Sequence, residues 1–361
     1  MRHLSRRHML KSGGGAGLAA AFSGPSPLRA DSLIHHRVPA EEAPHDATFM
    51  QWPVTQQVYF DRDFREYVQN AIIRLANTIA AFEPVIVLAD ANHHGQLSRR
   101  LSQNVTLWDI STDDLWARDS GPLFTRYSNG GLAVSHIQFN GWGRYNLRHD
   151  ECIAERVADR LGLPLLPADL IGEPGGVETD GHGVLMAHES SWRTQARNPR
   201  LPLEVIEQRL LTAYGANRLI WSAGVAGRDV TDFHIDGLAR FTGPGRVLMT
   251  LPSHPDPHDP FHMAALETEA ALRRARLSVD VIYEPERPRI SDPEFVAAYA
   301  NFYVCNGAVI VAEFGDHDAD TTARAALTRH YPRREVIQMN ADALGELGGG
   351  IHCATQQMPA V

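Results

Sequence analysis

A regular alternation of short apolar segments and longer segments with helical spacing is the feature that most constrains the fold of this chain. The short segments, rich in β-branched residues, are 84–88, 105–108, 132–139, 183–187, 218–221, 247–251, 279–283, 308–312 and 336–339. Between several of them, apolar residues recur at spacings of three and four at 64–82, 152–161, 203–214, 261–274 and 319–331. Strands that alternate with helices predict the α/β class.

The arrangement of these strands is less constrained than their class. A doubly wound parallel sheet is the usual solution, but no Gly-x-Gly-x-x-Gly follows the first predicted strand. Several short strands also accompany each helix, so repeated strand-strand-helix-strand modules fit the pattern at least as well. No strict period is visible in the residues, and both arrangements stay open at this level.

The first thirty residues differ from the rest of the chain. They read MRHLSRRHMLKSGGGAGLAAAFSGPSPLRA, which is basic, then small and apolar, then rich in proline. This is the plan of an export signal, and the Arg6-Arg7 pair resembles the twin-arginine signal of bacteria. We therefore expect residues 1–30 to be a removable signal and the protein to be periplasmic or secreted. Residues 31–361 contain no low-complexity linker or charge block and are predicted to be one domain.

Composition excludes several classes of protein. A hydrophobic content of 43% and a charged content of 21% are typical of globular proteins. Beyond the N-terminus no apolar run is long enough to predict a membrane span. The formal net charge is −9, and removal of the signal would take away five basic residues and no acid. This balance argues against a nucleic-acid partner and suits a cationic one. Lys11 is the only lysine, so the mature chain would have none for Schiff-base chemistry.

Three cysteines, Cys152, Cys305 and Cys353, are present, and no Cys-x-x-Cys spacing indicates zinc. Cys305 lies in a strand-like apolar segment and is expected in the core. Cys353 follows three glycines and His352 in the segment GGGIHCATQQ. Taken alone, this segment is either a glycine loop with a small buried cysteine or a backbone that passes close to another group.

Four other segments carry polar residues that an apolar core would not need. They are WARDSGP at 116–122, EPGGVETDG at 173–181, DVTDFHIDG at 229–237 and NFY at 301–303. Taken singly, the first two are typical of a surface turn and a hairpin turn, and the last is typical of core. In the third, His234 and Asp236 are two residues apart and are predicted to share one face of a strand. Its additional carboxylates would be costly to bury without a cationic partner.

A thiol, an imidazole and several carboxylates together restrict the chemistry. A Cys-His pair supplies an activated nucleophile and a proton carrier. In a papain-like protease the cysteine precedes the histidine, whereas His234 precedes Cys353 here, and peptide cleavage gives the acids no role. A guanidinium substrate explains them, because carboxylates match its planar fork of donors. Asp119, Glu173 and Asp236 would hold it and leave its carbon open to a thiolate.

These segments, taken in order, resemble the agmatine deiminase family. The segments are WARDSGP, EPGGVETDG, DVTDFHIDGLARF, NFYVCN and GGGIHCATQQ, and APHDATFMQWP at 43–53 extends the match to roughly residues 40–358. The family includes the bacterial peptidylarginine deiminase type and belongs to the guanidine-modifying, or pentein, superfamily. The resemblance implies a five-bladed α/β propeller of strand-strand-helix-strand modules around a central site, in place of a doubly wound sheet. Residues 31–361 would form the deiminase catalytic domain.

The resemblance also implies a role for each motif residue. The nucleophile would be Cys353, the general acid/base His234, the guanidinium-binding acids Asp119 and Asp236, a further active-site acid Glu173, and the residue packed against the substrate stem Trp116. No metal and no organic cofactor is implied. No oligomeric state is predicted.

The expected reaction is hydrolytic deimination through a covalent amidino-cysteine. With agmatine, a precursor in putrescine biosynthesis, the products would be N-carbamoylputrescine and ammonia. One alternative is an exported peptidylarginine deiminase that converts arginine residues to citrulline. Another is an inactive periplasmic protein that binds guanidinium or polyamine ligands.

Overall fold

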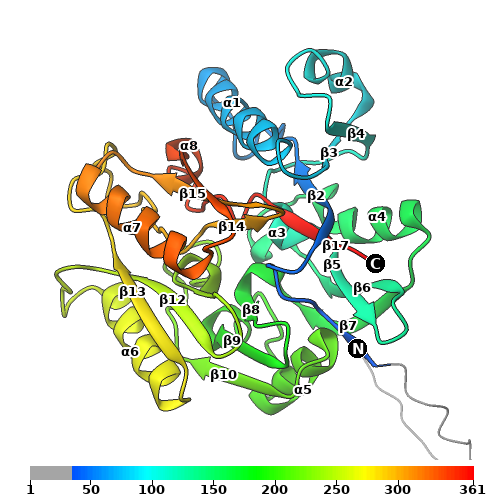
Figure 1. Ribbon diagram of the computed structural model, residues 1–361. Coiled ribbons are helices and arrows are strands. Elements are labelled where there is room, and N and C mark those ends of the chain that lie inside the picture. The colour runs from blue at the N-terminus through cyan, green and yellow to red at the C-terminus, as the bar shows by residue number, and fades with distance from the viewer. Residues whose placement is uncertain (1–34) are drawn as a thin grey trace, which may run out of the picture. The chain divides into compact units, whose positions relative to one another are not determined.

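The computed structural model describes residues 35–361, so the export signal predicted at residues 1–30 lies outside the described residues. Five separate sheets occur in this part of the chain, and long helices connect successive strands within them (Figure 1). The predicted α/β class is confirmed. Each of the nine predicted strands and five predicted helices coincides with an observed element to within a few residues.

Four consecutive modules have the same construction. In each, two antiparallel strands are followed by a helix and by a third strand that pairs in parallel with the second. A parallel pair needs such a crossover connection. The modules are β5 (Leu123–Tyr127), β6 (Leu132–Gln138), α4 (Ile153–Leu161) and β7 (Leu165–Ile171); β8 (Val177–Thr179), β9 (Val184–His188), α5 (Leu203–Tyr214) and β10 (Arg218–Ser222); β11 (Ala239–Phe241), β12 (Arg246–Leu251), α6 (Pro260–Arg274) and β13 (Ser278–Tyr283); and β14 (Tyr303–Cys305), β15 (Ala308–Glu313), α7 (His317–His330) and β16 (Glu335–Asn340).

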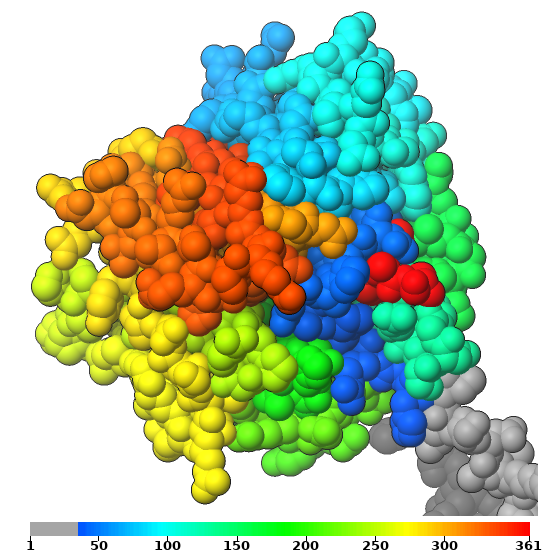
Figure 2. Space-filling model, in the orientation of Figure 1, coloured from blue at the N-terminus to red at the C-terminus, as the bar shows by residue number. Residues whose placement is uncertain are grey.

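The fifth module joins the two ends of the described chain. Strand β17 (Gln356–Pro359) pairs antiparallel with β2 (His45–Gln51), whose crossover helix α1 (Arg62–Ile79) leads to β3 (Val85–Ala89). Helix α2 (Ala91–Leu97) then leads to a further parallel strand, β4 (Val105–Asp109), and β1 (His36–Arg37) pairs with β5. The last strand thus lies beside the first long one, as the red and blue segments show (Figures 1 and 2). The closed five-bladed propeller stays a prediction.

Local sequence explains where several helices begin and end. Asp61 precedes α1 and accepts a hydrogen bond from the amide of Phe64, and Asp259 caps α6 in the same way ahead of Pro260. Helix α5 is followed by Gly215, whose φ of +62° suits glycine and where an added Cβ would collide with the carbonyl of His36. No helix within residues 35–361 combines the length and apolar character needed to cross a bilayer.

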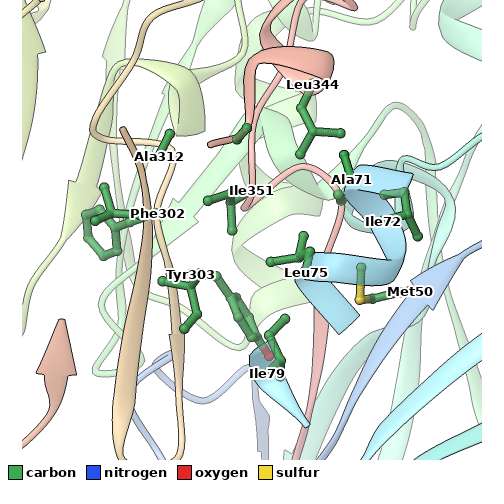
Figure 3. Packing of buried hydrophobic residues seen from close by; sticks show 14 of the residues in the cluster. Met50, Ala71, Ile72, Leu75, Ile79, Phe302, Tyr303, Ala312, Leu344 and Ile351 are labelled. Carbon is green, nitrogen blue, oxygen red and sulfur yellow. The ribbon is translucent and has the colours of Figure 1, made fainter. Parts of the chain in front are cut away.

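The largest hydrophobic cluster lies behind the segment that carries Cys353. Leu75 and Ile79 of α1 lie near Tyr303 and Ile351 (Figure 3), and Phe302 belongs to the same cluster. The short helix α8 (Asp342–Gly345) contributes to the same cluster immediately before the glycine run. Burial of these side chains fixes the backbone on both sides of the polar residues described below.

Candidate active site

The predicted site residues lie on the connections between consecutive modules. Asp119 lies between β4 and β5, Glu173 between β7 and β8, His234 and Asp236 between β10 and β11, and Cys353 between β16 and β17. The connections bring all five side chains into one cluster, in which the three acids and His234 are buried and Cys353 is partly buried. Residues far apart in the sequence form one site because each lies on an equivalent connection between modules.

The expectation that His234 and Asp236 share a strand face is wrong. Asp236 lies in a single 3₁₀ turn, Ile235–Gly237, which His234 precedes. Asp232 and Phe233 have φ values of +59° and +69°, a left-handed conformation that ends any regular strand. The two side chains reach the site through this irregular loop and not through strand alternation.

Cys353 lies in a turn, with its sulfur between an amide and a carboxylate. Nδ2 of Asn301 donates to Sγ at 3.1 Å, and Sγ donates to Oδ2 of Asp236 at 3.4 Å. Burial raises the pKa of the Cys353 thiol well above its usual range, and the carboxylates of Asp236 and Asp119 raise it further. The free site therefore favours the neutral thiol.

His234 is the histidine whose ring contacts two carboxylates of the cluster. Its Nε2 donates to Oε2 of Glu173 at 3.1 Å, and its Nδ1 lies 3.6 Å from Oδ1 of Asp119. Burial alone would lower the pKa of His234, but Asp119 and Glu173 outweigh burial and raise the pKa to about 9. A Cβ on Gly175 would lie 2.5 Å from Oδ1 of Asp119, so only glycine lets the backbone approach here. The imidazolium form of His234 is thus favoured at neutral pH.

Both oxygens of Glu173 already have protein partners. Nε of Arg197 donates to Oε1 at 3.0 Å and to Oε2 at 2.7 Å, and Nη1 of Arg197 donates to Oδ2 of Asp232 at 2.7 Å. The Arg197 side chain has no exposed surface, so it is a buried cation between two acids. Glu173 is therefore placed to orient His234, whereas the sequence predicted that it would also bind the guanidinium.

Asp119 and Asp236 each keep one oxygen without a hydrogen bond. Oδ2 of Asp119 accepts from Nε1 of Trp142 at 2.9 Å, and Oδ2 of Asp236 accepts from Nδ1 of His352 at 2.7 Å. Oδ1 of each is buried and has no hydrogen-bond donor among residues 35–361, and the neighbour of Oδ1 of Asp119 is Nδ1 of His234 at 3.6 Å. Such orphaned acceptors are costly unless a ligand satisfies them.

The pKa values of these two acids differ sharply. Burial raises the pKa of Asp119 to about 6, since the lowering effect of His234 only partly offsets it. Burial opposes ionisation of Asp236 as well, but the hydrogen bond and charge of His352 prevail and lower its pKa to about 2. Both carboxylates are negative at neutral pH and are suited to a cationic ligand.

The glycine run before Cys353 is explained by two close approaches. A Cβ on Gly349 would lie 2.5 Å from the ring of Trp116, and a Cβ on Gly350 would lie 2.5 Å from Oδ1 of Asn301. Trp116 lies at the start of α3 (Ala117–Ser120) and is buried, contrary to the surface-turn interpretation of its segment. Glycine at both positions lets the cysteine turn pack against the site.

A network of buried charges lies behind Asp236. Nε2 of His352 lies 2.9 Å from Oε2 of Glu41. The same carboxylate pairs with Arg118 through Oε2 at 3.1 Å and with Arg240 through Oε1 at 2.9 Å. Arg240 also pairs with Glu178 at 2.7 Å. Burial opposes the charge on Glu41, but Arg240 and His352 hold the pKa of Glu41 well below its usual range. The network fixes His352, and through it Asp236.

Sequence reasoning missed several members of the site. Arg197 carried no motif, Trp142 was given no role, and Asn301, although part of the NFY segment, was assigned to the core with its aromatic neighbours. His352 was noted only as a neighbour of Cys353. Cys305 is buried in β14, as expected. No three His, Cys, Asp or Glu side chains in the described part of the chain are grouped to hold a metal ion.

Comparison with known proteins places the chain in a family. The model of the Porphyromonas-type peptidyl-arginine deiminase family matches residues 37–359. A Streptomyces coelicolor protein, provisionally named agmatine deiminase, is 33% identical over 90% of this chain and 98% of its own length. The agmatine deiminase of Pseudomonas aeruginosa is 31% identical over 92% and 97%. The solved agmatine deiminase of Enterococcus faecalis superposes with a TM-score of 0.83 at 26% identity, over 90% of this chain and 96% of that one.

The fold and these relatives define a hydrolase of the agmatine deiminase type, a class that acts on the C–N bonds of amidines. The chain belongs to the Porphyromonas-type peptidyl-arginine deiminase family, as its motifs predicted. The predicted enzyme class is thereby confirmed.

Proposed function

We propose that the site deiminates agmatine to N-carbamoylputrescine and ammonia. The observation that carries this proposal is a pair of buried oxygens without a hydrogen-bond donor, Oδ1 of Asp119 and Oδ1 of Asp236, in the cluster where the other oxygen of Asp236 accepts from Sγ of Cys353. A guanidinium offers a planar fork of donors and a permanent positive charge, so it satisfies both acceptors at once. Trp116 would pack against its apolar stem. The relatives from P. aeruginosa and E. faecalis are named agmatine deiminases.

The first half of the reaction would form a covalent intermediate. Burial, together with Asp236 and Asp119, holds the thiol pKa high in the free site. The positive charge of the bound guanidinium offsets both carboxylates and favours the thiolate, so the thiol pKa falls and the thiol releases its proton to solvent. The Cys353 thiolate then attacks the guanidinium carbon. The His234 imidazolium donates a proton to the departing nitrogen, so the C–N bond breaks and ammonia leaves an amidino group on the sulfur.

The second half would release the product. His234, now neutral, accepts a proton from a water molecule that attacks the amidino carbon. The C–S bond breaks, the remaining hydroxyl proton passes to solvent as the C=O bond forms, the thiolate and the His234 imidazolium are restored, and the carbon leaves as a ureido group. Glu173, held by Arg197, keeps the imidazole oriented through both halves. No step calls for a metal or an organic cofactor.

We also propose that the five modules are the blades of a closed propeller around this site. Five sheets of related construction, the pairing of β17 with β2, and site residues on the connections between modules support this arrangement. A propeller places equivalent connections at one end of its axis, which would account for their convergence.

Peptidyl arginine is the second candidate substrate. The description of the matching family model names peptidyl-arginine deiminase, and export from the cytoplasm, which we propose for residues 1–30, would expose the enzyme to proteins outside it. The chemistry at the guanidinium would be the same. The two candidates differ in what the site must accept beyond the apolar stem.

One assay separates the candidates. Ammonia release is measured in parallel from agmatine, free arginine and an arginine-containing peptide, with the Cys353→Ala enzyme as the blank. The proposal expects the highest kcat/KM with agmatine. Preference for the peptide would favour the second candidate, and ligand binding without ammonia from any compound would favour an inactive binder.

A further inference from the structure

The loop that carries His234 has an irregular backbone that other parts of the chain hold in place. After β10 the chain forms no helix or strand until it has passed His234. Asp232 and Phe233 adopt left-handed φ values of +59° and +69°, which non-glycine residues keep only where their surroundings hold them. Oγ of Ser190 donates to the carbonyl of Asp232 at 2.6 Å. The position of His234 therefore depends on contacts from outside its own segment.

His188, the last residue of β9, contacts this loop immediately before His234. Its side chain is fully buried, and Nδ1 donates to the carbonyl of Phe233 at 2.7 Å. The rings of His188 and Phe233 also stack, with their centroids 4.7 Å apart and an angle of 11° between their planes. On its other side, Nε2 of His188 lies 3.1 Å from Oγ1 of Thr268 in α6. His188 thus joins the loop to β9 and to α6.

The contact with Phe233 fixes the tautomer of His188. A carbonyl oxygen can only accept, so the bond requires a proton on Nδ1. Burial lowers the pKa of His188 to about 4, because the bond to Phe233 only partly offsets it and the charge of His234 acts in the same direction as burial. The ring is therefore neutral at pH 7, with its one proton on Nδ1. It remains a donor over the pH range in which His234 would exchange protons.

The bond matters because the carbonyl of Phe233 and the amide of His234 belong to one peptide unit. The amide end donates to Oγ1 of Thr231 at 3.2 Å, so both ends of the unit are held. A peptide unit is planar, so loss of either contact allows it to rotate as a whole about its two flanking bonds. Such a rotation changes the direction in which the Cα of His234 projects its side chain.

The direction of this side chain decides which acids the imidazole meets. Nε2 of His234 lies 3.1 Å from Oε2 of Glu173, and Nδ1 lies 3.6 Å from Oδ1 of Asp119. Burial opposes the charge on the ring, but Asp119, Glu173 and Asp236 raise its pKa to about 9. Displacement of the ring from these acids would lower that pKa. The bond from His188 therefore bears on the protonation state of His234.

We propose that His188 is a positioning residue, whose Nδ1–H group holds the peptide unit before His234 and keeps the imidazole between its two acids. This inference rests on the proposed function, in which His234 carries the proton. Asp236, one of the acids proposed to bind the guanidinium, has a separate support in His352. Loss of the His188 bond should therefore slow the chemical step more than it weakens binding of the substrate.

Two substitutions separate the hydrogen bond from the shape of the side chain. Asn and Leu both branch at Cγ and have similar volumes, and neither keeps the ring. His188→Asn can place its NH₂ group where Nδ1 was, because both nitrogens are bonded to Cγ, whereas His188→Leu has no donor. We expect kcat for the best substrate to fall at least about tenfold in His188→Leu and less than about threefold in His188→Asn. KM should change less than about threefold in both.

The protonation of His234 gives a second readout, which needs no substrate. The Cε1–H signals of the histidines are followed by NMR from pH 5 to pH 10.5, and the signal of His234 is identified by its loss in His234→Asn. The pKa of His234 should stay at about 9 in His188→Asn and should fall below about 8 in His188→Leu. A substitution that only destabilises the fold would not move this pKa. The titration requires no turnover, so its result is separate from failure of the deimination assay.

The matched control is His94→Leu. Nε2 of His94 donates to the carbonyl of Ala89 at 3.0 Å, which is the same kind of bond, and α2 carries no residue of the site. This variant should keep both kcat and the pKa of His234. His188→Phe is a second variant without the donor, and it keeps a ring against Phe233 in case His188→Leu does not fold.

Two results would overturn the proposal. A folded His188→Leu or His188→Phe enzyme with kcat within about twofold of the wild type would show that the bond is dispensable. Equal effects of His188→Leu and His188→Asn would show that the ring, and not its Nδ1–H group, holds the loop.

Discussion

Nδ1 of His352 lies 2.7 Å from Oδ2 of Asp236, and Nε2 of the same ring lies 2.9 Å from Oε2 of Glu41. The imidazole therefore bridges two buried carboxylates, one in the site and one in the charge network behind it. This bridge holds one oxygen of Asp236 and leaves the other free for a ligand. The residue before the nucleophile thus positions the acid that is proposed to bind the guanidinium.

Removal of this bridge should weaken the site through Asp236. In His352→Phe the ring volume is kept, but Asp236 loses the partner that does most to lower its pKa, so the pKa of Asp236 should rise. We expect kcat/KM for agmatine to fall at least about tenfold at pH 7.5, with a larger loss at pH 5.5. Initial rates at the two pH values check this, and an equal loss at both would contradict a role through Asp236.

The charge of Asp236 should matter more than its shape. Asp236→Asn preserves size but replaces an acceptor oxygen with an NH₂ group that faces another donor. Truncation of one partner in a buried charged pair costs roughly 2–5 kcal/mol. We expect kcat/KM for agmatine to fall at least about a hundredfold, with a normal circular dichroism spectrum. A folded Asp236→Asn enzyme within fivefold of the wild type would show that this residue does not hold the guanidinium.

The elements that sequence predicted well are the buried inner strands and their helices. β12 and β15 are continuous apolar segments, and α1 has a complete apolar stripe. The missed strands lack such a signal. β8 and β14 are three residues long, β7 contains Pro167, and β17 begins with two glutamines. Their pairing is decided by partners elsewhere in the chain, which a local pattern does not contain.

Site residues were predicted where one short segment contains the informative pattern. They were missed where their role depends on contacts with distant segments. Asp119, His234 and Cys353 stand in polar or glycine-rich segments that a core would not need, so each could be singled out. Arg197 was invisible because its partners, Glu173 and Asp232, lie 24 and 35 residues away. Asn301 lies in a segment that was singled out, but it was assigned to the core with its two aromatic neighbours, because only the folded cysteine turn brings its amide to Sγ of Cys353.

Cys353→Ser should separate binding from chemistry. The two carboxylates and the bridge to His352 are untouched, so agmatine should still bind, whereas a serine hydroxyl is far less ionised than a thiol and should not attack. We expect turnover at background rate with a dissociation constant close to the wild-type KM. Calorimetry checks the binding, and loss of binding in a folded variant would mean that Cys353 is structural.

The same variant should show a pH-dependent affinity. Asp119 has a pKa raised to about 6, so it is negative above that pH and neutral below it, while Asp236, with a pKa of about 2, stays negative throughout. Agmatine binding to Cys353→Ser should therefore weaken as pH falls from 7 to 4.5 and stay constant from 7 to 8. Calorimetry across this range measures it. The double variant Asp119→Asn/Cys353→Ser should bind more weakly, and without this pH dependence; an unchanged slope would assign the titration to another group.

Residues 1–30, which lie outside the described structure, are predicted to direct export of the protein. We propose that Arg6 and Arg7, ahead of a weakly apolar run with no acidic residue, direct the chain to the twin-arginine pathway. That pathway reads the arginine pair itself and not its charge, so Arg6→Lys with Arg7→Lys should leave a full-length precursor in the cytoplasm. Arg2→Lys with Arg29→Lys is the matched control, because it also replaces two arginines by lysines but leaves the pair intact. This control should be exported normally. Fractionation followed by mass measurement of the N-terminus checks both variants. Processed protein in the periplasm from the Arg6/Arg7 variant would refute the twin-arginine route, and retention of both variants would show that export depends on arginine content and not on the pair.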